Sequence, residues 1–133
     1  MPCYMLDTNM CIYLMRNQPK EVSQRFAQCY VGDVVISAIT LAELEFGISV
    51  CADPERERKN LDALIELIEV KSFDVSAARS YGPVRKTTRE RKSDHLDKLI
   101  AAHAIALGAT LVTNNESDFA AYPALTMENW IKH

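Results

Sequence analysis

The chain has 133 residues, of which 48% are hydrophobic and 25% charged, with a formal net charge of −3. That length fits one domain, taken here as residues 1–133, and it can bury a core without disulfides. The composition excludes a disordered chain, and no apolar run has the length of a membrane span. The four scattered cysteines suit free thiols in a reducing compartment, so a cytoplasmic protein is expected.

Short apolar runs alternate with segments whose apolar residues recur at helical spacing. Because the strands are apolar throughout, a parallel-sheet α/β/α sandwich is expected. Gly82-Pro83 is expected to kink or break one helix, and Gly108 to end another. The predicted elements are, in chain order, a strand at 3–6, helices at 8–15 and 19–29, a strand at 34–37, helices at 39–50 and 54–69, a strand at 70–75, helices at 76–91 and 96–107, and strands at 109–113 and 125–127.

The candidate site residues are four acids, Asp7, Glu43, Asp97 and Asp118, of which three lie near predicted strand ends or helix starts and Glu43 lies in the helix after the strand at 34–37. Ligands bind beyond the carboxyl ends of parallel strands, so one edge of the sheet can collect these acids. Each acid also has a purely structural explanation. Asp7 suits a helix N-cap, Asp97 complements a helix dipole, and Asp118 suits a solvated turn, whereas Glu43 stands in an otherwise apolar helix.

Gathered carboxylates repel one another, by roughly 3 kcal/mol for two charges about 5 Å apart at an effective dielectric near 20. A hard divalent cation relieves this repulsion, since Mg²⁺ and Mn²⁺ prefer oxygen ligands. The cysteines and histidines show no zinc spacing that would favour a softer metal. We therefore expect a Mg²⁺ site, with Mn²⁺ able to substitute, in which Asp7 and Asp97 are ligands.

Basic residues crowd one segment although the net charge is negative, and Arg79 and Lys98 flank its centre. The run is either a solvated helix face or a contact surface for the backbone of RNA. The residues predicted to contact RNA are Arg85, Lys86, Arg89, Arg91 and Lys92.

The motifs LDTN, SAITLAELEFG, DKLIAAHAIALGATLVTNN and ENW resemble PIN-domain ribonucleases, most of all the VapC toxins of bacterial toxin–antitoxin pairs. The resemblance covers about residues 4–130. It implies a Mg²⁺-dependent endoribonuclease toxin that cleaves transfer RNA in the anticodon region. It also implies a homodimer and a VapB-type antitoxin whose C-terminal segment wraps the toxin. Surplus apolar residues in 39–68 predict that these helices form the antitoxin groove.

By motif, Asp7, Glu43 and Asp97 match the first three acids of that family. Asp118 is the candidate fourth acid, because Asn115 stands where some members have aspartate. In place of the usual Gly/Ile/Pro-rich turn before the third acid, the chain has RKSDH, whose Asp94 is an extra acid that could compete. The polar residues that match supporting positions of the site are Thr8, Asn9, Thr113, Asn114 and Asn115.

Two other functions fit part of this pattern. A haloacid-dehalogenase-type phosphatase needs a second aspartate two residues after the first, and Asn9 occupies that place. A catalytically silent PIN-fold module would bind RNA or a partner without cleaving, and the presence of all four acids argues against it. His103 lies roughly 240° around the predicted helix from Asp97, so it and His95 are expected to be structural.

Overall fold

The computed structural model describes residues 3–131, so the first two and last two residues of the predicted domain lie outside the described residues. Helices and strands alternate along the chain as the sequence predicts. In chain order the elements are β1 (Tyr4–Leu6), α1 (Thr8–Arg16), α2 (Lys20–Ala27), β2 (Val34–Ser37), α3 (Ala38–Val50), α4 (Pro54–Leu67), β3 (Glu69–Lys71), α5 (Val75–Thr87), α6 (His95–Leu107), β4 (Thr110–Val112), α7 (Glu116–Phe119) and β5 (Thr126–Glu128).

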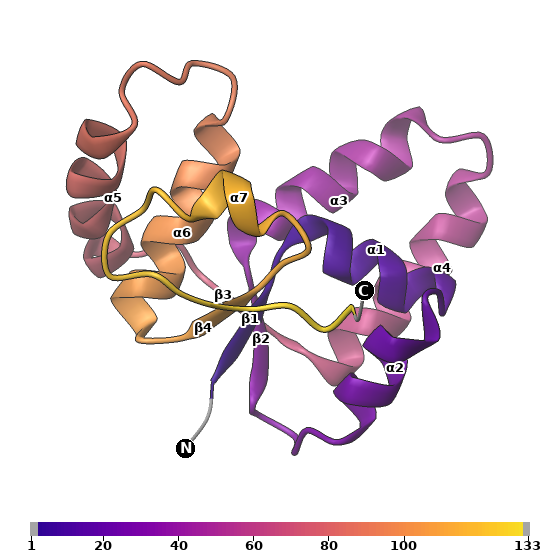
Figure 1. Ribbon diagram of the computed structural model, residues 1–133. Coiled ribbons are helices and arrows are strands. Elements are labelled where there is room, and N and C mark those ends of the chain that lie inside the picture. Colours follow the sequence, from indigo (N-terminus) through magenta and orange to yellow (C-terminus); the bar gives the residue numbers. More distant parts are fainter. Residues whose placement is uncertain (1–2, 132–133) are drawn as a thin grey trace.

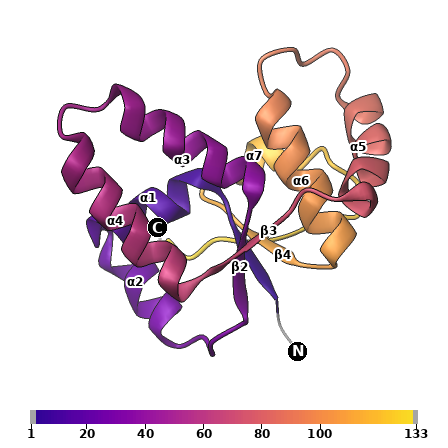
Figure 2. The same cartoon turned by 180° about the vertical axis from the view of Figure 1, so that it is seen from behind.

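The five strands form one parallel sheet in the order β3-β2-β1-β4-β5. The chain moves outward from β1 through β2 to β3 and then crosses to the other side of β1. This reversal leaves a switch point at the carboxyl end of β1, where such sheets bind ligands. Helices α1–α4 cover one face of the sheet, and α5 and α6 cover the other (Figures 1 and 2).

Each face of the sheet has its own hydrophobic core, because successive strand residues point to opposite faces. Leu6 and Ile36 pack with α1–α4, whereas Met5, Val35 and Leu111 pack with α5–α7. The predicted parallel α/β/α sandwich is thereby confirmed. In the described part of the chain, no helix is long and apolar enough to cross a membrane.

Most boundaries lie within a few residues of the predictions, and the strand at 34–37 and the helix end at Gly108 are confirmed. The predicted strand 70–75 is wrong in extent, because Asp74 caps α5 by accepting a hydrogen bond from the Ala77 N–H at 2.9 Å. Of the predicted kink or break at Gly82-Pro83, the break is wrong, because α5 continues through both residues. Pro83 lies inside α5, where the missing Cβ of Gly82 reduces the clash that a proline imposes on the preceding residue.

Two further differences affect the site. Helix α5 ends at Thr87 rather than at residue 91, and residues 88–94 form a loop before α6. The segment after β4 was expected to be a polar turn, but it contains the short helix α7, whose Phe119 is buried.

The edge strands β3 and β5 are three residues long and carry charged side chains. On β3, Lys71 and Glu69 form an ion pair of 2.7 Å. On β5, Glu128 accepts hydrogen bonds from Arg25 at 3.3 Å and from Trp130 at 2.9 Å.

Candidate active site

Asp7 follows β1 at the switch point and is buried, with only 5% of its surface exposed. It is the N-cap of α1, and its Oδ1 accepts the Met10 N–H at 2.9 Å. Burial raises the pKa of Asp7 and repulsion from Glu43 adds to this, while hydrogen bonds from Thr113, Met10 and Asn9 oppose the rise. The capping role is thus confirmed, and it fixes the carboxylate in one orientation.

Glu43 reaches the same place from α3, which starts directly after β2. The Thr8 hydroxyl donates to Glu43 Oε1 at 2.7 Å. This bond joins the first residue of α1 to the middle of α3, so Thr8 supports the site as predicted by position. The Asn9 side chain is exposed, and Asn9 contributes its backbone N–H to Asp7.

Asp97 lies in the first turn of α6 and is half-buried. Burial is the largest cause that raises its pKa, to about 6. Repulsion from Glu43, Asp7, Asp118 and, more weakly, Asp94 raises it further. The four predicted acids therefore share one electrostatic environment, although they come from four separate parts of the chain.

Asp118 lies on α7, next to buried Phe119, and its side chain is exposed. Its backbone carbonyl accepts a hydrogen bond from the Arg91 guanidinium at 2.8 Å. Asp118 acts on Asp97 less strongly than Glu43 and Asp7 do. It is the outermost of the four acids.

The polar residues after β4 hold one another in place. The Thr113 hydroxyl donates to Asp7 and accepts the Asn115 N–H at 2.9 Å. Asn129 donates to Asn114 Oδ1 at 3.1 Å. Sequence reasoning missed Asn129 as a supporting residue, although it belongs to the ENW motif. Asn115 itself is exposed at the start of α7.

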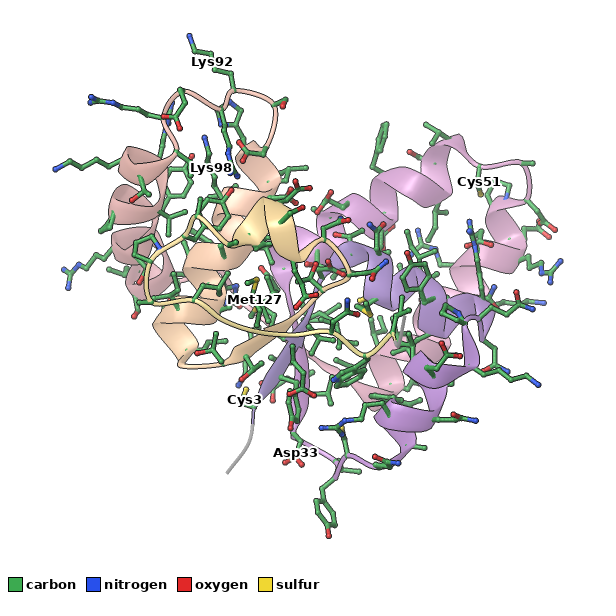
Figure 3. All side chains as sticks on the ribbon, viewed as in Figure 1. Cys3, Asp33, Cys51, Lys92, Lys98 and Met127 are labelled. Atoms are coloured by element: carbon green, nitrogen blue, oxygen red, sulfur yellow. The ribbon has the colours of Figure 1, made fainter. Side chains whose placement is uncertain are left out.

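Asp94, the extra acid, has structural partners of its own. It precedes α6, forms an ion pair with Lys98 at 3.2 Å, and accepts a hydrogen bond from Tyr122 at 2.9 Å. Lys98 is buried, so it is not part of a solvated basic surface. In Figure 3 Lys98 points inward, while Lys92 points outward from the loop.

The remaining predicted RNA contacts lie on α5 and the loop that follows it. Lys86, Arg89 and Lys92 are exposed. Arg85 is exposed and lies with its guanidinium 6.0 Å from the centre of the Tyr81 ring. Arg91 is half-buried and already bound to the Asp118 carbonyl. The basic run is therefore mostly, but not wholly, a solvated surface.

The two histidines occupy structural or exposed positions. His103 is buried, its Nδ1 lies 2.8 Å from the Ser37 hydroxyl, and its ring meets Phe73 edge-on at 5.4 Å. Burial lowers the pKa of His103, which keeps the ring neutral at pH 7. His95 is exposed. The predicted structural role of His103 agrees with these contacts.

The donor set suits a hard divalent cation better than any other ligand. All the acids offer carboxylate oxygens, and a cation would relieve the repulsion that Asp97 experiences. Within residues 3–131, however, no three His, Cys, Asp or Glu side chains are close enough to enclose a metal ion as they stand. Two carboxylates are enough for Mg²⁺, which usually keeps several waters and is held by one or two carboxylates.

Comparison with known proteins places this architecture in a family. The PIN domain model matches residues 4–125. Ribonuclease VapC2 of Rickettsia felis is 38% identical, over 97% of this chain and 98% of the relative. The tRNA(fMet)-specific endonuclease VapC of Shigella flexneri is 35% identical, over 96% and 97% of the two chains. The crystal structure of VapBC2 from Rickettsia felis bound to promoter DNA aligns with a TM-score of 0.89 and 35% identity, covering 97% of this chain and 99% of that one.

A parallel sheet that collects acids at its switch point, matched over most of its length by the family model, defines the class. The chain belongs to the PIN-domain family, and its full-length relatives place it among the VapC ribonucleases of that family.

Proposed function

We propose that this VapC ribonuclease is the toxin of a toxin–antitoxin pair, depends on Mg²⁺, and cleaves transfer RNA in its anticodon region. The main support for the proposed metal dependence is the environment of the Asp97 carboxyl group. Burial, and then the charges of Glu43, Asp7 and Asp118, raise the pKa of this carboxyl group to about 6. A divalent cation is the ligand that this arrangement favours.

Asp7 and Asp97 are the proposed metal ligands. Asp7 has a fixed orientation, because the Met10 N–H and the Thr113 hydroxyl hold its carboxylate. Glu43 is held by Thr8 and completes the negative pocket. When bound, a Mg²⁺ ion supplies Lewis acidity and lowers the pKa of a coordinated water. Asp7 and Asp97 would hold the ion, and Glu43 would add negative charge beside it.

Transfer RNA is the proposed substrate on two grounds. A full-length relative is a tRNA(fMet)-specific endonuclease. Exposed basic side chains, Lys86, Arg89 and Lys92, follow α5 in the segment that leads to Asp97. An unpaired loop is favoured over a duplex, since its nucleotides can be splayed to expose one phosphate.

A VapB-type antitoxin is the proposed partner, since the similar solved structures are VapBC complexes. Helix α3 leaves Phe46 68% and Val50 66% exposed, although Ile48 between them is buried. A groove of about 250 Å³ lies between α1, α2 and α4, lined by Leu14, Phe26, Leu64 and Leu67 among others. A second groove runs between α1 and α3 from Thr8 and Glu43 toward Cys51, so an antitoxin arginine in it could reach the acids.

The antitoxin groove is therefore proposed over a wider surface than the helices at 39–68, since α1 and α2 also line it. A homodimer is proposed from the family resemblance. A cytoplasmic location is proposed because all four cysteines are free thiols, which suits a reducing compartment.

The substitutions Asp7→Asn and Asp97→Asn test the metal-dependent activity. Each should lower the rate of RNA cleavage roughly a thousandfold, which corresponds to about 4 kcal/mol in the activation barrier. Asparagine also caps helices, so Asp7→Asn should keep α1 in place. Glu66→Gln, at an exposed position on α4, is the matched control. The measurement is cleavage of purified transfer RNA with Mg²⁺ or Mn²⁺.

Full activity in both variants, or in wild-type protein with excess chelator, would contradict the proposal. RNA binding without cleavage in the wild-type protein would favour a silent binding module instead.

A further inference from the structure

Lys98 is a charged side chain in an unusual place, with 1% of its surface exposed. A buried ammonium group is costly unless it is paired and hydrogen-bonded. Its Nζ donates to the carbonyls of Thr88, at 2.9 Å, and Arg91, and lies 3.2 Å from Asp94 Oδ1. Two N–H groups thus donate to carbonyls of the loop at 88–94, and the ammonium group pairs with the Asp94 carboxylate, whose Oδ1 accepts no hydrogen bond within the described residues. This loop is folded around the ammonium group.

The same contacts continue to α7. Asp94 Oδ2 accepts the Tyr122 hydroxyl at 2.9 Å and lies 3.7 Å from the Arg91 guanidinium. Arg91 in turn donates to the Asp118 carbonyl at 2.8 Å. Tyr122 packs edge-on against Phe119, with 5.8 Å between ring centres. Lys98, Asp94, Arg91 and Tyr122, here named the Lys98 network, therefore join α6, the loop and α7.

Helix α7 needs such external support. It has four residues, and a helix that short is not stable by itself in water. Within the Lys98 network, Arg91 bonds to the Asp118 carbonyl of α7, and Tyr122, three residues beyond α7, donates its backbone N–H to the Phe119 carbonyl at 3.2 Å. A buried ion pair often adds no more stability than apolar side chains would, so its presence here needs another explanation.

We infer that the Lys98 network positions Asp118 beside Asp97, so that the metal site is complete only when the loop at 88–94 is folded around Lys98. This inference rests on the proposed metal-dependent function. The four residues are positioning residues: they act through Asp118 and the first turn of α6, and none of them is a proposed metal ligand. Arg91 accordingly serves the site rather than RNA.

The test uses the full chain with Lys98→Met and Tyr122→Phe. Lys98→Met removes the ammonium group and keeps most of the apolar stem, and Tyr122→Phe removes one hydroxyl. The matched controls are Lys59→Met and Tyr30→Phe, which change exposed side chains away from the site. Mn²⁺ affinity is measured by calorimetry at a temperature where circular dichroism shows every variant folded. Amide hydrogen exchange is measured on the same proteins without metal.

Both network variants should bind Mn²⁺ roughly tenfold more weakly, or worse, than wild-type protein, a change of about 1.4 kcal/mol. Amide exchange should accelerate in residues 88–94 and 116–122 and stay unchanged in α1–α4. The controls should match wild type in both measurements. If Lys98→Met does not fold, Tyr122→Phe alone decides the question.

Wild-type Mn²⁺ affinity in folded network variants would overturn the inference and leave the proposed function standing. So would unchanged exchange in residues 116–122. If the wild-type protein itself bound no Mn²⁺, the proposed function would fail, and the inference with it.

Discussion

The ionisation of Asp97 links the candidate site to the folding stability of the protein. A carboxyl group has a pKa near 3.9 in an unfolded chain. Burial and then the neighbouring acids raise the pKa of Asp97 to about 6 in the folded protein. Between these two values the folded state binds more protons than the unfolded state. The stability of the metal-free protein should therefore fall as the pH rises through this window, and then level off above pH 6.

Asp97→Asn should remove that penalty. Without metal and near pH 7, the variant should be more stable than wild type by about 1 kcal/mol, after a discount for the exposed part of the side chain. This corresponds to a Tm higher by roughly 4 °C. Near pH 3 the two proteins should be equally stable, because Asp97 is then mostly protonated in both states. Thermal unfolding in chelator at the two pH values measures the difference.

Glu66→Gln is the control for that series, since it removes an exposed acid from α4. With Mg²⁺ added, the wild-type protein and Glu66→Gln should gain stability and Asp97→Asn should not, because a ligand stabilises the state that binds it. A variant that is less stable at neutral pH without metal would contradict the argument. If Asp97→Asn were more stable than wild type by the same amount at both pH values, that result would contradict it as well.

The four acids were predicted from their combination and from motifs such as LDTN and DKLIAAHA, since each acid alone also had a structural explanation. Lys98 could not be predicted in the same way. In the sequence it looks like the last member of a basic run, and only the loop that closes over it shows that it is buried. The partnership of Asp94 with Tyr122 joins residues 28 positions apart, for which no local pattern exists.

At the scale of elements, the segment from α5 to α6 has two sides with different contacts. Its inner side binds Lys98, and its outer side carries the exposed residues Lys86, Arg89 and Lys92. The sequence predicted one helix through residue 91, because a charged run with few breakers is typical of a helix. The sequence did not show that α5 ends at Thr87, or that the backbone carbonyls of Thr88 and Arg91 beyond it bind Lys98.

Replacing Lys86, Arg89 and Lys92 together by glutamine should weaken binding of transfer RNA. The slope of log K against log salt should become shallower by about 2, because each phosphate of a single strand that a basic side chain neutralises adds about 0.7 to it. Mn²⁺ affinity should not change, because none of the three contacts the acids. The matched control is a double substitution of Arg56 and Lys59, exposed basic residues on α4. The measurement is a filter-binding or fluorescence titration at several salt concentrations. An unchanged salt slope would show that this surface does not bind transfer RNA.

For the whole molecule, the sheet separates two layers with different surfaces. The α1–α4 layer has the grooves and the exposed Phe46, Val50 and Leu67, whereas α5 and the loop after it carry the exposed basic run Lys86, Arg89 and Lys92. The predicted sandwich was secure from sequence because apolar strands and amphipathic helices alternate. The difference between the surfaces of its two faces could not be predicted, because it depends on which helix covers which face.

Phe46→Ser combined with Leu67→Asp should release the enzyme from its VapB-type antitoxin. Both side chains are exposed, so folding should be kept, and transfer RNA cleavage should persist without antitoxin. Removing two apolar side chains from the interface should weaken the complex by roughly a hundredfold or more, at about 1.4 kcal/mol per factor of ten. Val75→Ser, at an exposed apolar position on α5, is the control. Undiminished inhibition of the double variant would place the antitoxin elsewhere.

The two edge strands limit how copies of this molecule can associate. A long, uncharged edge strand is a template for pairing with another chain and for fibre growth. Here β3 and β5 each offer three residues, and the charges of Glu69, Lys71 and Glu128 stand along them. Continuation of the sheet from one copy into the next is therefore disfavoured. We therefore expect a dimer of this chain to use helix surfaces, and a concentrated preparation should resist amyloid-like aggregation.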